Sequence, residues 1–152
     1  MRYDEAARSL LTGLKNRAER VRVAELADAM APLAPVLEGL VVTWAPTGGA
    51  RRRRRGFDQA ELLARAVARR RGLPVVRLLR RLGGPAQAGR SRTERWVGPR
   101  FAARAWSSPV LVIDDVATTG ATLSAAAEAL RRAGVPEVHG LVAARAQPSA
   151  WG

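Results

Sequence analysis

An apolar run, two adjacent acids and a threonine-glycine loop stand together in residues 110–122, VLVIDDVATTGAT. The two carboxylates, Asp114 and Asp115, accept hydrogen bonds and suit a pair of sugar hydroxyls. The three threonine hydroxyls of the loop can donate to the oxygens of a phosphate group. Neither packing nor turn formation requires this combination, so it indicates a ligand that carries both a diol and a phosphate, such as a phosphorylated ribose.

A strand and a helix must position these groups. Residues 109–114 are continuously apolar up to the first acid, which predicts a strand covered on both faces. Residues 118–134 predict a helix. The first N–H groups of a helix lack partners within it and lie at the positive end of its dipole, so they suit a phosphate. The predicted phosphate-binding residues are Thr118, Thr119, Gly120, Ala121 and Thr122.

The rest of the chain alternates helices and strands. One or two amphipathic helices are expected in residues 3–33, broken near Pro32 and Pro35, and another in residues 57–72, with Asp58 as its cap and Gly72 at its end. Strands are expected in residues 40–46, 75–79 and 138–146, and a long basic loop in residues 83–100. This order predicts an α/β fold with a mostly parallel sheet, in which ligands bind beyond the carboxyl ends of the strands.

The positive charge is regional. Residues 51–104 contain 17 arginines and three acids, whereas the rest of the chain has nine basic and ten acidic residues. An anionic partner is therefore expected: phosphate, pyrophosphate or nucleic acid. The absence of cysteine excludes disulfides, thiolate zinc sites and cysteine nucleophiles. No apolar run approaches the ~20 residues of a membrane span, so we expect a soluble cytoplasmic protein without membrane insertion.

Two other phosphate-binding motifs do not fit residues 110–122. A P-loop requires a lysine that this stretch lacks, and a receiver domain requires later Asp and Lys residues that do not follow Asp115. Two acids beside a pyrophosphate favour Mg²⁺, which prefers carboxylate, hydroxyl and phosphate oxygens.

The stretch resembles the thirteen-residue phosphoribosyl-pyrophosphate (PRPP) motif of type I phosphoribosyltransferases. Residues 53–75, RRRGFDQAELLARAVARRRGLPV, resemble the ComF-like competence proteins of that fold, although relatives often have a zinc module that is missing here. The resemblance implies one phosphoribosyltransferase-like domain over residues 1–152, with N-terminal helices in 1–38 and a PRPP-binding core in 39–152. It also implies a three-layer, Rossmann-like sheet with a flexible loop and hood.

The resemblance assigns roles to individual residues. Asp114 and Asp115 would be the catalytic pair that holds the ribose hydroxyls, with Mg²⁺ nearby and held through the ligand. The flexible loop would contribute Gln87, Ser91 and Arg95. The pyrophosphate site would comprise Thr47, Gly48, Gly49, Arg51 and Arg55.

Two departures from the family pattern stand out. Asp58 occupies a position where the family has Asn, and Thr118 one where purine-base phosphoribosyltransferases often have Asp. No other residue offers itself as a general base, so the nucleophile that would receive the phosphoribosyl group stays open.

Three function classes follow. The first is an enzyme that transfers phosphoribose from PRPP, or from another phosphoribosyl compound, with release of pyrophosphate. The second is a non-catalytic accessory of DNA uptake that binds single-stranded DNA or a protein of the competence machinery. The third is a regulatory module that senses a nucleotide. The oligomeric state, including a dimer, is open.

Overall fold

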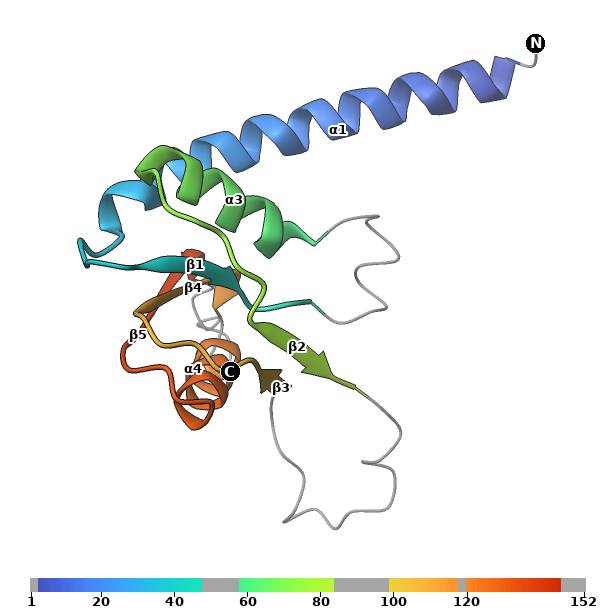
Figure 1. The fold of residues 1–152 in the computed structure, drawn as a ribbon. Helices are drawn as coiled ribbons and strands as arrows, with labels where there is room; N and C mark the ends of the chain where they lie inside the picture. Colours follow the sequence, from blue (N-terminus) through green and yellow to red (C-terminus); the bar gives the residue numbers. More distant parts are fainter. Residues whose placement is uncertain (1–2, 48–57, 84–98, 118–119, 146–152) are drawn as a thin grey trace, which may run out of the picture.

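The computed structural model describes residues 3–47, 58–83, 99–117 and 120–145, with side chains for 16–47, 58–83, 99–115 and 120–143. The described chain contains helices, strands and one 3₁₀ turn (Figure 1): α1 (Tyr3–Met30), η1 (Ala31–Leu33), β1 (Val41–Trp44), α3 (Gln59–Arg71), β2 (Leu79–Leu82), β3 (Arg100–Ala103), β4 (Val110–Ala117), α4 (Ala121–Arg132) and β5 (Val138–Arg145).

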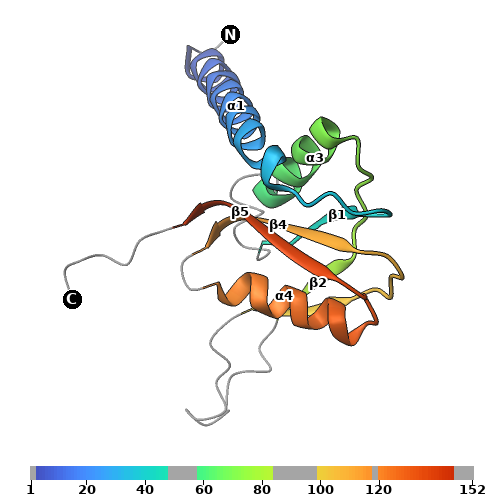
Figure 2. The same cartoon turned by 90° about the vertical axis from the view of Figure 1, so that its left-hand side faces the viewer.

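Three parallel strands form the central sheet, in the order β1-β4-β5. Helices α1 and α3 cover one face, and α4 covers the other (Figure 2). Side chains alternate along β4 between the two apolar layers: Leu111 and Ile113 belong to the α3 side, whereas Val110 and Val112 belong to the α4 side. This is the three-layer α/β arrangement with a mostly parallel sheet that the sequence predicts, and the continuous apolar run of β4 follows from its burial on both faces.

The ends of α3 agree with the sequence prediction. The Asp58 side chain caps the helix by accepting a hydrogen bond from the N–H of Ala60. Gly72 ends the helix in the left-handed conformation with φ 64°, which a residue without a Cβ adopts at little cost.

The strand predicted to begin at Val75 becomes regular only at Leu79. Val75 makes only an isolated parallel bridge with Val42, and the regular strand β2 begins at Leu79. β2 pairs antiparallel with β3, so these two strands form a separate ribbon. The chain leaves β1 because the N–H of Leu78 donates to the buried Thr43 hydroxyl, at 3.2 Å, where a continued ladder would use a backbone carbonyl.

The N-terminal helix α1 is continuous to Met30, and the break predicted near Pro32 is the 3₁₀ turn η1. Its C-terminal part packs against α3 through Val23, Ala27 and Met30, and its N-terminal part extends beyond the sheet (Figure 1). No helix among the described residues is both long and apolar enough to span a membrane.

Candidate functional site

The central strand β4 carries the acidic pair beyond the point where β1 stops pairing with it. The ladder between the strands ends at Trp44 opposite Ile113, with a last hydrogen bond from the N–H of Ala45 to the Ile113 carbonyl at 3.0 Å. Asp114 is the next residue of β4 and still pairs with β5. The acids therefore lie at the carboxyl end of β1, where a ligand of such a sheet is expected.

The two acids differ in environment. Asp114 is only 4% exposed, and its Oδ1 accepts a hydrogen bond from the N–H of Asp115 at 2.9 Å. Asp115 is half-buried. Burial and the negative charges of Asp115 and Asp58 together raise the pKa of Asp114 to about 7, whereas the hydrogen bond from the Asp115 N–H opposes the shift. Near neutral pH, a partner that donates hydrogen bonds to this carboxyl favours its charged form.

Helix α4 begins directly after the loop predicted to hold phosphate. Gly120, with φ 79°, is its N-cap, so no side chain at that position caps the helix. Ala121 opens the helix and Thr122 lies half-buried in its first turn. Thr118 and Thr119 lie outside the described residues. Gly120, Ala121 and Thr122 therefore lie at the start of α4, and their binding of phosphate stays a prediction.

Only one residue of the predicted pyrophosphate site is described. Thr47 lies just after β1, and its backbone N–H donates to Asp58 Oδ2 at 3.0 Å. The other predicted members lie outside the described residues, as do all three predicted residues of the flexible loop: Gly48, Gly49, Arg51, Arg55, Gln87, Ser91 and Arg95.

Two residues that contact Pro46 or Thr47 were not predicted as parts of a site. Asp58 was expected only to cap α3, yet it is 6% exposed, contacts Thr47 and lies close enough to Asp114 to affect its pKa. Arg81, on β2, donates from Nη1 to the carbonyl of Pro46 at 3.3 Å. The sequence marks Asp58 as a helix cap, eleven residues after Thr47. Nothing in the sequence distinguishes Arg81 from its neighbours.

The described residues contain no group of three or more acidic, histidine or cysteine side chains that could hold a metal ion. Asp114 and Asp115 suit a Mg²⁺ ion that is bound mainly through the ligand, rather than one enclosed by protein side chains. Mg²⁺ usually keeps several waters and binds through substrate phosphates.

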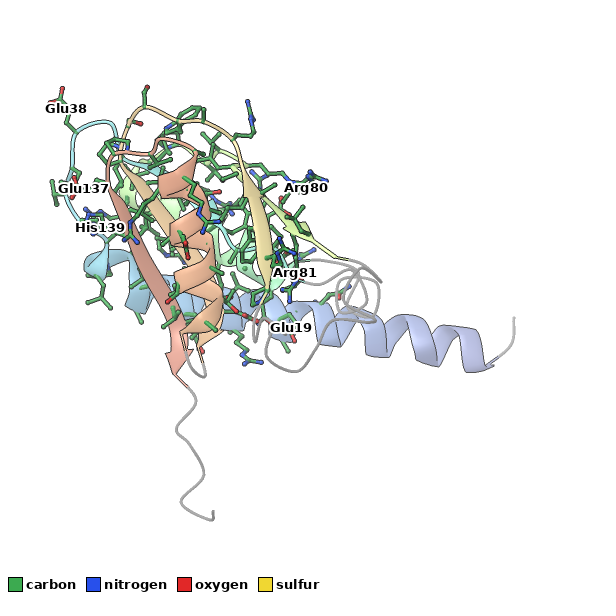
Figure 3. All side chains as sticks on the ribbon, turned by 90° about the horizontal axis from the view of Figure 1, so that it is seen from below. Glu19, Glu38, Arg80, Arg81, Glu137 and His139 are labelled. Carbon is green, nitrogen blue, oxygen red and sulfur yellow. The ribbon has the colours of Figure 1, made fainter. Side chains whose placement is uncertain are left out.

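His139 lies on β5, and its Nε2 is 2.8 Å from Glu137 Oε1. It lies on the opposite side of the molecule from Arg80 and Arg81 (Figure 3).

Solved structures provide the similarities to known proteins. No protein-family model and no curated protein matches the sequence. Among 14 similar chains of solved structures, one is described as the allosteric regulatory enzyme of purine biosynthesis. The similarity has 22% identity and a TM-score of 0.54, and it covers 80% of this chain and 25% of that one. A second is orotate phosphoribosyltransferase from Aeropyrum pernix, with 19% identity, a TM-score of 0.45, and coverage of 87% and 74%.

The first of these similarities bears on the fold alone. The chain spans about a quarter of the length of the first similar structure. The similarity supports the α/β fold with a mostly parallel sheet that the sequence predicts. What the protein binds has to be argued from its own residues.

Proposed function

We propose that the protein binds PRPP, or a closely related phosphoribosyl compound, with Mg²⁺ at the carboxyl end of β1 and β4. The observation that carries the proposal is the placement of two acids on β4 immediately before a glycine-capped helix α4. Asp114 and Asp115 would accept hydrogen bonds from the ribose hydroxyls. The N–H groups at the start of α4 would bind the 5′-phosphate, together with the threonine hydroxyls.

The reaction such a site supports is transfer of the phosphoribosyl group. The bond between the anomeric carbon and the pyrophosphate oxygen breaks, its electron pair leaves with pyrophosphate, and a nucleophile forms the new bond to that carbon. The chain would contribute mainly by holding the ribose and excluding alternative geometries. Mg²⁺, when bound, neutralises charge on the departing pyrophosphate. As a ComF-like protein it would act on a nucleophile that the described residues do not identify.

Calorimetry with PRPP and Mg²⁺ tests the assignment of the acids. The double variant Asp114→Asn with Asp115→Asn should bind PRPP at least about 100-fold more weakly, because each hydrogen bond to a charged group contributes about 1.5–3 kcal/mol. The fold should persist, since the amide oxygen introduced at position 114 can still accept a hydrogen bond from the backbone N–H of residue 115.

A matched control removes two acids elsewhere. Glu128→Gln with Glu137→Gln changes exposed residues of α4 and the β5 edge, whose carboxylates pair with Arg132 and His139. This control should bind PRPP as the wild type does. Equal affinity of both double variants and the wild type contradicts the proposed site.

A second candidate function, binding of single-stranded DNA, rests on the β2–β3 ribbon, residues 77–83 and 99–104. The ribbon contains no acid, and each of its arginines is exposed: Arg77, Arg80, Arg81, Arg100 and Arg104. None of the ion pairs among the described residues involves a ribbon arginine. Arg80 extends away from the molecule (Figure 3).

A groove of about 400 Å³ on this ribbon is lined by Arg77, Arg80 and Arg104 around an apolar floor that includes Ala102 and Ala103. Positive side chains beside an apolar surface suit a nucleic-acid strand, whose phosphates and base faces need both. The groove therefore favours the DNA-binding alternative over an uncharged partner.

Salt titration of oligonucleotide binding tests this candidate. Arg77→Gln, Arg80→Gln and Arg104→Gln together should lower the slope of log affinity against log salt by about 2, at ~0.7 per lost phosphate contact on a single strand. The matched control replaces three exposed arginines of α1 by glutamine: Arg17, Arg20 and Arg22. Equal slopes for the two triple variants contradict a specific role of the ribbon.

A further inference from the structure

One peptide group, between Pro46 and Thr47, is bound on both sides by side chains from other elements. Its carbonyl accepts a hydrogen bond from Arg81 Nη1 on β2, at 3.3 Å. Its N–H donates to Asp58 Oδ2 at the start of α3, at 3.0 Å. A peptide group is planar, so two contacts on opposite edges fix its orientation.

The pattern of the β1–β4 ladder shows what these contacts replace. The N–H groups of Val41 and Ala45 donate to the carbonyls of Pro109 and Ile113, so donors recur at every second residue of the strand. The next donor in this series is Thr47, and a regular ladder would direct it to the carbonyl of Asp115. Its partner is instead Asp58. The chain therefore turns from β4 beside the acidic pair.

Asp58 does more than a helix cap requires. A cap needs one oxygen, and Asp58 Oδ1 fills that role by accepting from the Ala60 N–H at 3.1 Å. The second oxygen is the one that holds Thr47. Asp58 is 6% exposed, and a buried carboxylate is stabilised by such backbone donors. Both oxygens are thus committed, each to a different element.

We propose that Asp58 and Arg81 are positioning residues that clamp the Pro46–Thr47 peptide, turn the chain away from β4 and present the Thr47 hydroxyl to the diphosphate of the ligand. This inference rests on the proposed function for the identity of the ligand. The clamp acts on the diphosphate side and leaves the acids and the start of α4 in place. It therefore determines the preference for PRPP over ribose 5-phosphate.

Two variants remove the hydrogen bonds to the Pro46–Thr47 peptide and leave the capping and packing of α3 in place. Asp58→Ser keeps a side-chain oxygen that caps α3, but the shorter side chain has no second oxygen for Thr47. Arg81→Gln shortens the donor that reaches Pro46. Arg69→Gln, which changes an exposed arginine near the end of α3, is the control.

The first readout needs no ligand. Amide hydrogen exchange at Thr47 should be slow in the wild type and at least about tenfold faster in Asp58→Ser, whereas the Ala60 amide should exchange as before. Fast exchange at Thr47 in the wild type overturns the clamp, whether or not the protein binds PRPP.

The second readout compares two ligands by calorimetry, PRPP with Mg²⁺ and ribose 5-phosphate. Arg81→Gln should lower the affinity ratio of PRPP to ribose 5-phosphate at least about tenfold and leave ribose 5-phosphate affinity unchanged. Asp58→Ser should lower the same ratio at least about tenfold, although loss of its charge also changes the pKa of Asp114. Arg69→Gln should alter neither affinity. A merely structural role would weaken both ligands together, and that result, or an unchanged ratio, overturns the specificity role. Failure of the wild type to bind either ligand overturns the proposed function itself.

Discussion

Near neutral pH, Asp114 lies between its two protonation states, because burial, together with the negative charges of Asp115 and Asp58, raises its pKa to about 7. The spacing of residues 110–122 predicts where this carboxyl lies but not its charge. Charge depends on what covers the side chain, and here the covering comes from elements distant in sequence. Asp58 illustrates the same limit, because its cap follows from local spacing and its bond to Thr47 does not.

A pH dependence of stability follows for Asp114. Its pKa rises from 3.8 in an exposed setting to about 7 in the folded protein, so between these values the native state holds a proton that the unfolded state has released. Folding stability from this group is therefore present at low pH and is lost as pH rises from about 4 to about 7.

Denaturant titrations at several pH values measure this effect. The free energy of unfolding of the wild type, relative to Asp114→Asn, should fall between pH 4 and pH 7 and level off above it. A difference that stays constant over this range would show that Asp114 has an ordinary pKa in the folded protein.

At the scale of elements, the sequence predicts those whose signals are local. Helix α3 has a cap and a left-handed glycine at its ends, and β4 has an apolar run. The β2–β3 ribbon could not be predicted, because its pairing joins residues about twenty positions apart and its start depends on the Thr43 hydroxyl. Val75, at the expected strand, makes only a bridge.

Thr43→Val tests how much the hydrogen bond between Thr43 and Leu78 stabilises the start of the β2–β3 ribbon. Thr43 is fully buried, and its hydroxyl accepts the hydrogen bond of the Leu78 N–H. Valine has nearly the same shape but no acceptor, so the buried N–H loses its partner and the free energy of unfolding should fall by about 1–3 kcal/mol. Thr43→Ser keeps the hydroxyl and is the control. An equal or smaller loss in Thr43→Val than in Thr43→Ser would assign the effect to packing alone. Thermal or urea unfolding gives both values.

At the scale of the whole molecule, topology accounts for the candidate site. Parallel strands end on the same edge of the sheet, so the end of β1 lies beside the acids on β4 although the two are far apart in sequence. This convergence follows from the order of elements and was predictable. The clamp on Pro46–Thr47 was not, since Asp58 and Arg81 meet that peptide only after α3 and the ribbon have packed.

The central position of β4 has a further consequence for recognition. With a strand on each side and a helical layer on each face, β4 should open only when the whole domain unfolds. Asp114 and Asp115 therefore lose little conformational entropy when a ligand docks on them. Affinity at this site should accordingly gain little from substitutions that stiffen β4 further.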